Sequence, residues 1–286
     1  EPTYIQDDYY EQMRALTRYD DEIDEEMILL KNRMHSILQL SFPELEKILT
    51  PNSALFLNIV QLYPHPTLVL AHSKTVIKNR LKANTRKNLS LERAEKKAIA
   101  LLEAAQNSYP AIRSTDVRCE QVRDYANRIA ELKDKKEALV QQMITLSKDR
   151  KEYIVLRSIP GIGDSTACRL IGEMGDIRRF QHAKQLNAYA GIDIMRYQSG
   201  NTQYHDRINK RGNKHLRKLL YFMVCAMIMK KKDKPNHFVD YYYKLKTQPQ
   251  RKPHKVAIIA CINKFLKVTF QLLTHGILYD YETALS

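Results

Sequence analysis

A polar stretch in the second half of the chain places a serine close to many cations. Residues 195–218 read MRYQSGNTQYHDRINKRGNKHLRK, with Ser199 directly before Gly200. Guanidinium groups grip phosphate oxygens through two N–H donors and ammonium groups act as point charges, so this composition indicates phosphate binding. A solvated basic helix face is the alternative, and a Ser-Gly pair taken alone is typical of a turn. From Arg207 onward the basic residues are Arg207, Lys210, Arg211, Lys214, Arg217 and Lys218, and the stretch holds the single acid Asp206.

A second motif, LRSIPGIGDSTACRLIGEM at residues 156–174, predicts a tight glycine connection into an amphipathic helix. Asp164 or Ser165 is the expected N-cap, and the buried face is expected to carry Ala167, Leu170, Ile171 and Met174. The pattern indicates a helix-hairpin-helix, in which glycines let the backbone approach a phosphate and helix N–H groups bind it. An ordinary glycine turn between packed helices is the alternative. The residues expected at the phosphate are Gly161, Gly163, Asp164, Ser165 and Thr166.

Three other clusters carry weaker signals. Residues 74–87 hold six cations and no acid, and residues 244–255 hold five cations beside Tyr241, Tyr242 and Tyr243. Aromatic rings among cations suit single strands or RNA, but tyrosines that anchor a helix end are an equally good interpretation. Residues 20–26 hold six acids that point around most of one helix, which favours a solvated face over a two-metal site. The four cysteines have no metal-ligand spacing, so no metal site is predicted in this chain.

Composition and charge limit the class of protein. The chain has 286 residues with 44% hydrophobic and 28% charged residues, typical of a folded protein. Its longest apolar run, residues 219–229, is too short to span a bilayer, and no leader follows Glu1. These features predict a cytoplasmic, nucleoid-associated protein with no membrane partner. The net charge of +15 is uneven, at −7 for residues 1–50, +8 for 51–150 and +14 for 151–286, which indicates a nucleic-acid partner.

Helices must position these clusters, because the chain has few glycines and little strand alternation. Two strings with heptad spacing predict long helices able to form coiled coils, each with one break, at Asp20 and at Lys136. A helix follows a Ser90 cap, and two periodic helices follow Gly212, the second over about 255–274. The prediction is an all-α protein with a helical, coiled-coil region at 1–150 and a helix-hairpin-helix domain at 151–286. The string members are Met13, Leu16, Ile23, Met27, Leu30, Met34 and Ile37 in the first, and Val122, Tyr125, Ile129, Leu132, Leu139, Met143 and Leu146 in the second.

The ordered strings SIPGIGDSTA, GDIRRF, QLNAYAGI, YQSG, INKRGNKHLRKLLY and KVAIIACINKFL resemble the C-terminal transposase domain of the IS110/IS116/IS902 insertion-sequence family, over about residues 157–280. Residues 1–150 resemble the helical middle of that family more loosely. The resemblance implies DNA strand transfer by a serine nucleophile, which the motif places at Ser199. It also implies a RuvC-like domain whose four acids bind Mg²⁺ and, for some members, a structured guide RNA. Nothing in this chain matches those acids, so the chain is expected to be inactive alone.

Three functions remain open at this stage. The first is a DNA transposase or site-specific recombinase acting on double-stranded DNA as a dimer or tetramer formed through the coiled coils. The second is a non-catalytic helix-hairpin-helix module that needs the basic surface but not Ser199. The third is an RNA-binding scaffold based on residues 74–87 and the coiled coils. A helical hairpin within one chain is the competing explanation for the heptad strings.

Overall fold

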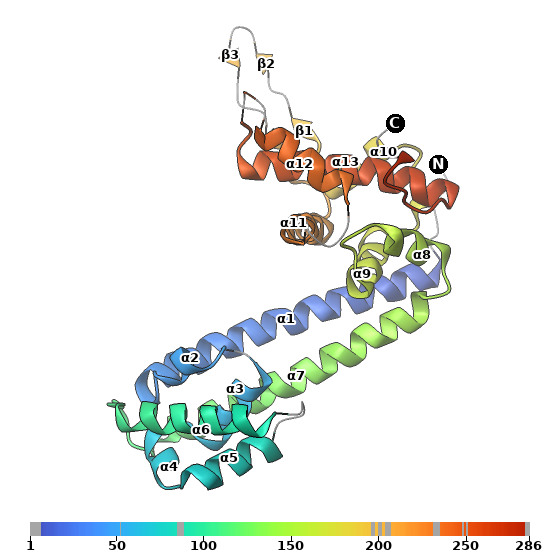
Figure 1. The fold of residues 1–286 in the computed structure, drawn as a ribbon. Helices are drawn as coiled ribbons and strands as arrows, with labels where there is room; N and C mark the ends of the chain where they lie inside the picture. Colours follow the sequence, from blue (N-terminus) through green and yellow to red (C-terminus); the bar gives the residue numbers. More distant parts are fainter. Residues whose placement is uncertain are drawn as a thin grey trace. The chain divides into compact units, whose positions relative to one another are not determined.

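The structure is a computed structural model that describes residues 7–51, 53–84, 89–195, 198–199, 202–203, 207–230, 235–247, 249 and 251–283, with the backbone alone described at 194, 195, 198, 199, 202, 203 and 207. It confirms the all-α class (Figure 1). Four two-residue strands accompany the helices: β1 (Ile194–Met195), β2 (Gln198–Ser199), β3 (Thr202–Gln203) and β4 (Arg207–Ile208). They form two short antiparallel pairs, β1 with β4 and β2 with β3.

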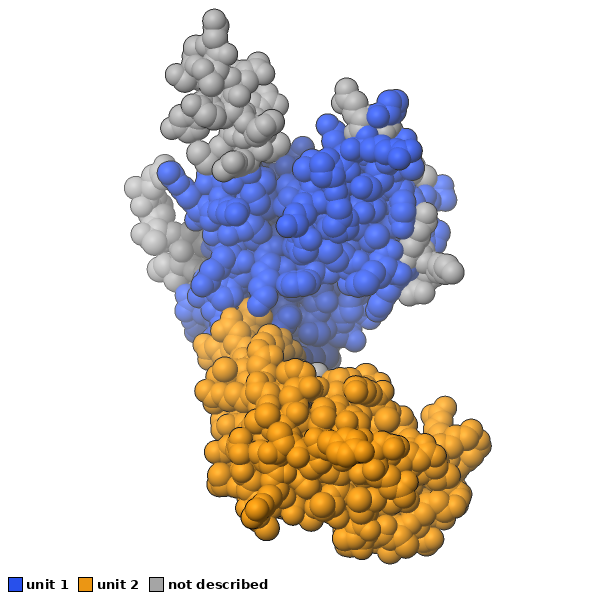
Figure 2. All heavy atoms as spheres, turned by 90° about the vertical axis from the view of Figure 1, so that its left-hand side faces the viewer, with its two compact units in different colours: residues 1–19, 139–286 blue, residues 20–138 orange. Residues whose placement is uncertain are grey.

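The chain divides into two compact units (Figure 2). Unit 1 is residues 1–19 and 139–286, and unit 2 is residues 20–138. This division differs from the predicted boundary at residue 150, because Tyr10 and Met13 near the N-terminus are buried in the same core as Met143 and Leu156. Composition describes only neighbouring residues. It therefore does not show that the first turns of α1 pack against residues far away in sequence.

Unit 2 contains most of the two long helices and the short helices between them. The elements are α1 (Asp8–Ser41), α2 (Leu45–Ile48), α3 (Ala54–Leu62), α4 (Pro66–Leu70), α5 (Lys74–Ala83), α6 (Leu91–Gln106) and α7 (Val117–Ser147), of which α1 and α7 extend into unit 1. Ser53, Ser73 and Ser90 cap α3, α5 and α6 by accepting a backbone N–H three residues on, which confirms the predicted Ser90 cap.

The two heptad breaks meet inside unit 2. Asp20 in α1 is fully buried, and the Lys136 ammonium of α7 lies 3.8 Å from its carboxylate and also pairs with Asp24. Arg128 of α7 pairs with Glu26 of α1 at 3.0 Å, so the helices run antiparallel here. The seam residues Ile23, Met27, Leu30, Met34, Val122 and Ile129 are buried within the chain. Within unit 2 the helical hairpin therefore buries much of the predicted seam inside one chain.

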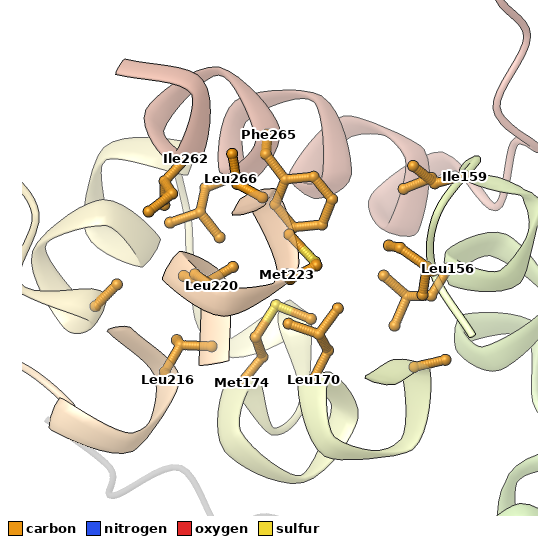
Figure 3. Packing of buried hydrophobic residues seen from close by; sticks show 14 of the residues in the cluster. Leu156, Ile159, Leu170, Met174, Leu216, Leu220, Met223, Ile262, Phe265 and Leu266 are labelled. Atoms are coloured by element: carbon orange, nitrogen blue, oxygen red, sulfur yellow. The ribbon is translucent and has the colours of Figure 1, made fainter. Parts of the chain in front are cut away.

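Unit 1 has one core built by helices from distant parts of the sequence. Its elements are α8 (Lys151–Ser158), α9 (Asp164–Met174), η1 (Ile177–Arg179), α10 (Ala183–Ala190), α11 (Lys214–Met229), α12 (His237–Thr247) and α13 (His254–His275). Leu156 of α8, Leu170 of α9, Leu220 of α11 and Phe265 of α13 point toward one another in this core (Figure 3). The predicted buried face of α9 is confirmed, with Ala167, Leu170, Ile171 and Met174 at 2% exposure or less.

Helix α13 agrees with the helix predicted over about 255–274. Among the described helices it is the one that is long and apolar enough to cross a membrane, judged by length and composition alone. Its apolar residues Ile258, Ile262, Phe265, Leu266 and Phe270 are buried in the core of unit 1, and packing against α10, α11 and α12 accounts for them.

Candidate nucleic-acid interface

A groove of about 910 Å³ lies along α11 and the first half of α13. Its cations come from two basic stretches that are separate in sequence, and no acid is found among the described residues that line it. Its apolar lining includes Tyr221, Phe222, Val256 and Ile259. The groove therefore combines a strongly positive rim with an apolar floor. The cations are Lys214, Arg217 and Lys218 of α11, with Lys252 and Lys255 at the start of α13.

The periodicity of α11 places its cations at the groove. Leu216, Leu220 and Met223 are buried in the core, so Lys214 and Lys218 on the other side of the helix are exposed. The Asn213 side chain fixes the helix start by accepting the backbone N–H groups of residues 215 and 216. Its amide also donates to the buried carboxylate of Glu173 in α9 at 2.6 Å. Glu173 thus holds the basic helix start against α9, a role that the sequence did not reveal.

Arg217 has a structural role that differs from its predicted one. Its guanidinium donates to the Ala190 carbonyl at 2.9 Å and to the Lys210 carbonyl at 3.3 Å. A Cβ added to Gly191, which has a φ of +69°, would meet this guanidinium and the Gly212 nitrogen. Arg217 also lines the groove, so its donors hold the loop before α11 while its predicted phosphate contact stays a prediction.

The remaining predicted cations lie ahead of α11. Lys210 and Arg211 are exposed in the turn before the helix. The Arg207 backbone pairs with Met195, and the Ser199 backbone pairs with Thr202 across the β2 and β3 pair. The side chains of Arg207 and Ser199 lie outside the described part of the chain. The assignment of Ser199 as a nucleophile stays a prediction.

The predicted glycine motif joins α8 to α9 through residues 159–163. Gly161 has a φ of +89°, and an added Cβ would lie 2.8 Å from the Met227 side chain, so this position requires glycine. The Asn236 amide donates to the Pro160 carbonyl at 2.8 Å and fixes the turn. A pocket of about 380 Å³ opens at this turn, with Arg157 and Lys230 in its lining.

The N-terminus of α9 differs from the predicted cap. Gly163 is the N-cap, and Asp164 is the first helical residue. The Asp164 carboxylate accepts the Tyr153 hydroxyl and pairs with Arg157, each at 2.6 Å. The Tyr153 hydrogen bond, together with Arg157, lowers the pKa of Asp164, while burial and the same hydrogen bond raise the pKa of Tyr153 to about 12. Asp164 is therefore a charged anion that opposes a phosphate at this helix start.

Ser165 and Thr166 follow in the first turn of α9 and are half-buried, whereas Gly161 and Gly163 are exposed. A Cβ added to Gly163 would meet nothing within 4 Å, so the backbone there is open to a ligand. The predicted phosphate contact would therefore use Gly163, backbone N–H groups and the nearby cations rather than the Asp164 carboxylate, and it stays a prediction.

Metal binding and catalysis by a cysteine nucleophile are two other chemistries to consider. Among the described residues, no group of three or more His, Cys, Asp or Glu side chains is arranged to hold a metal ion. The Mg²⁺ site that the family resemblance implies belongs to the RuvC-like domain, so it stays a prediction. Burial raises the pKa of Cys168 to about 11 and of Cys261 to about 12, so these thiols stay protonated and are poor nucleophiles.

The tyrosine run at 241–243 anchors α12 at two of its positions. The Tyr242 hydroxyl is 2.7 Å from the His254 ring at the start of α13, and Lys264 lies over the Tyr241 ring. In the other basic stretch, Lys74 pairs with Glu95, which offsets one positive charge of α5, and Arg80 contacts the His72 ring. Residues 85–88 at the end of that stretch, including Arg86 and Lys87, lie outside the described residues.

The sequence reasoning missed the floor of the groove. Phe222 is 61% exposed and Val256 is 51% exposed. Phe222 does not belong to the buried stripe of α11. A large apolar residue on the exposed side of a helix is the sequence feature that could have indicated a binding surface. The buried stripe of α11 does not show which residues lie next to the opposite side of this helix, because the neighbouring residues of α13 are about 35 positions away in sequence.

Fold and groove together define an all-α protein with a cationic, partly apolar groove, and comparisons with known proteins place it more closely. Residues 154–242 match the family described as Transposase IS116/IS110/IS902, and residues 19–185 match the family described as snoRNA binding domain, fibrillarin. The chain is 31% identical over 134 residues to the transposase for insertion sequence element IS1111A of Coxiella burnetii, covering 47% of this chain and 36% of that one.

Two further relatives extend the comparison. The insertion element IS110 uncharacterized 43.6 kDa protein of Streptomyces coelicolor is 22% identical over 284 residues, covering 96% of this chain and 66% of its own length. The pilin gene-inverting protein of Moraxella bovis is 29% identical over 127 residues, covering 44% and 38%. The chain is therefore similar to the IS116/IS110/IS902 transposases, through residues 154–242 and through these relatives. It spans about one third to two thirds of the length of these curated relatives.

Proposed function

We propose that this chain is the DNA-binding and strand-exchanging part of an insertion-sequence transposase, and that its groove along α11 and α13 holds the DNA backbone. The observation that carries the proposal is the set of five cations in the groove, whose described lining residues include no acid. Residues 1–19 and 139–286 together have a net charge of +13, against +2 for residues 20–138. Phosphate binding is dominated by such charge, and DNA is the polyanion that a transposase acts on.

The first test is the salt dependence of duplex DNA binding by the full chain. Lys214→Gln with Lys255→Gln removes two groove cations, and Lys47→Gln with Lys148→Gln removes two exposed cations elsewhere as a control matched in charge. Each neutralised phosphate releases about 0.9 counterion, so the groove variant should show a log–log salt slope shallower by about 2. The control should keep the original slope. Equal effects of the two variants would contradict the assignment of the groove.

Chemistry at Ser199 is the second part of the proposal. The serine oxygen would form a bond to phosphorus while the bond from phosphorus to one deoxyribose oxygen breaks; the serine loses its proton and the departing oxygen gains one. A covalent phosphoserine link keeps the DNA joined to the protein until a second deoxyribose oxygen attacks. The position of Ser199 in the YQSG string and the cations that follow it in sequence support this role.

Covalent capture of DNA tests the nucleophile. In a protein that joins this chain to the RuvC-like domain of the family, Ser199→Ala should abolish the protein–DNA adduct and leave DNA affinity nearly unchanged, because one neutral hydroxyl contributes little to binding through phosphates. Ser165→Ala is the control and should retain the adduct. An adduct that persists in the Ser199 variant would favour a non-catalytic binding module.

RNA binding is the second candidate function, and the match of residues 19–185 to the snoRNA-binding domain favours it. The low net charge of unit 2 makes it a weaker polyanion site than unit 1. Competition between an RNA hairpin and a DNA duplex of equal length for the full chain discriminates between the two. Stronger binding of the hairpin, lost on Lys78→Gln with Lys82→Gln in α5, would select the RNA scaffold.

A further inference from the structure

The floor of the groove has a composition that phosphate binding alone does not require. Phe222 is 61% exposed and Val256 is 51% exposed, and both lie among the five cations of the groove. The phosphates of a paired duplex lie on its outside and need only cations and N–H donors. Nucleic-acid bases, by contrast, stack on aromatic rings when they are unpaired. The exposed ring therefore suits a base more than a phosphate.

The dimensions and the polar groups of the groove agree with a base. A volume of about 910 Å³ is within the range of pockets that bind small organic molecules. The Phe222 ring is held beside Tyr221 in an edge-to-face pair with ring centroids 5.9 Å apart. Asn263 in the lining accepts a hydrogen bond from the Asn187 amide at 3.2 Å through its own oxygen, so its N–H groups can donate to a base edge.

We propose that the groove binds one unpaired nucleotide of DNA, with its base against Phe222 and Val256 and its flanking phosphates near Lys218 and Lys255. This inference rests on the proposed function and deepens it. A strand that leaves one duplex to join another has unpaired nucleotides at the exchange point, and such a nucleotide needs a surface that receives its base. The Asn263 amide then restricts which base edge fits best.

The experiment compares two DNA duplexes that differ by one unpaired thymine and uses the full chain. The wild-type protein should bind the duplex with the unpaired thymine at least fivefold more tightly than the paired duplex. Phe222→Ala should reduce this ratio to about one, because the loss of affinity should be larger for the duplex with the unpaired thymine. Met229→Ala, which removes an apolar side chain 80% exposed on the same helix but outside the groove lining, should keep the original ratio.

A spectroscopic readout accompanies the affinities. 2-Aminopurine at the unpaired position should lose fluorescence on binding the wild-type protein, because stacking on an aromatic ring quenches it, and should keep its fluorescence with Phe222→Ala. Both variants replace exposed side chains, and circular dichroism checks that they fold.

Different outcomes separate this inference from the proposed function. Equal affinity of the wild-type protein for the two duplexes, or a preference that Phe222→Ala leaves intact, would overturn the unpaired-nucleotide site while DNA binding stands. Failure to bind either duplex would overturn the proposed function itself. Tighter binding of an unpaired uridine in an RNA duplex than of the thymine in DNA would overturn the assignment to DNA.

Discussion

His237 begins α12 with only 2% of its surface exposed. Its Nδ1 lies 2.7 Å from the Tyr279 hydroxyl, and the two rings stack with centroids 5.3 Å apart. Burial, with the nearby charge of Lys264, lowers the pKa of His237 from 6.5 to about 4, and Asp240 opposes this shift. The folded protein therefore keeps this imidazole neutral at pH values where the unfolded chain binds a proton.

The shift of the His237 pKa predicts how stability depends on pH. Between pH 6.5 and about 4 the unfolded state carries a proton on His237 that the folded state lacks, so the free energy of unfolding should fall as pH falls through this window. The loss is on the order of 3 kcal/mol at most, from about 1.4 kcal/mol per pKa unit. Urea unfolding at pH 7 and pH 4.5 measures it, and His237→Gln should remove most of the difference. An unchanged difference in the variant would assign the effect to other groups.

At the residue scale, glycines also allow two segments of backbone to pack closely against each other. A Cβ at Gly212 would lie 2.4 Å from the Gly191 nitrogen and from the Tyr189 carbonyl oxygen, and one at Gly172 would lie 2.5 Å from the Thr17 hydroxyl. The first contact joins α10 to the loop before α11, and the second joins α9 to α1 within unit 1. The sequence showed seven glycines between residues 161 and 212, but only the packing shows which neighbours they approach.

At the scale of elements, the α1 and α7 hairpin in unit 2 is specified by a polar pair within an apolar seam. Asp20 is fully buried, and Lys136 is the cation that faces it. A shift of one helix along the other would bury Asp20 against apolar residues, which is costly, so the pair fixes the register. The sequence located both breaks in the heptads. That the two breaks face each other is a property of the folded hairpin.

Replacing one partner of the Asp20–Lys136 pair should lower the free energy of unfolding more than replacing both. Lys136→Met leaves the buried Asp20 carboxylate without its ammonium and should cost about 3–5 kcal/mol of stability. Adding Asp20→Leu should recover much of that loss, because an apolar pair suits the seam. Urea unfolding of the two variants measures the effect, with Arg128→Ala as a control that removes an exposed ion pair and should cost less than about 1 kcal/mol. Full additivity of the two substitutions would contradict a direct pairing.

At the scale of the whole molecule, the question is whether the heptad seam joins copies of the chain. Oligomer formation through the coiled coils stays a prediction, but the seam residues Met27, Leu30 and Ile129 are already buried within one chain. A seam that is mostly filled inside the chain leaves little apolar surface for a partner, although Leu146 is 39% exposed.

Concentration dependence of the melting temperature distinguishes the two cases. If the seam closes within one chain, the melting temperature should be the same at about 1 and 100 μM, because only association makes it depend on concentration. Leu30→Ala should lower it at both concentrations, since deleting a buried leucine side chain costs about 2–5 kcal/mol. A melting temperature that rises with concentration, with the rise lost in Leu30→Ala, would restore the intermolecular coiled coil.

The amino-acid sequence by itself determined the helices, their buried stripes and the excess positive charge of the second half, because these depend on local periodicity and composition. It also carried the family resemblance through ordered short strings. The tertiary structure decided which distant segments meet: Lys214 of one basic stretch with Lys255 of another, Asp20 with Lys136, and Tyr10 with the core of unit 1. It also showed that Arg217 and Asp164 have hydrogen-bond and ion-pair partners within the fold. Periodicity shows which side of a helix is buried, whereas the neighbour of the other side depends on how helices far apart in the chain pack in space.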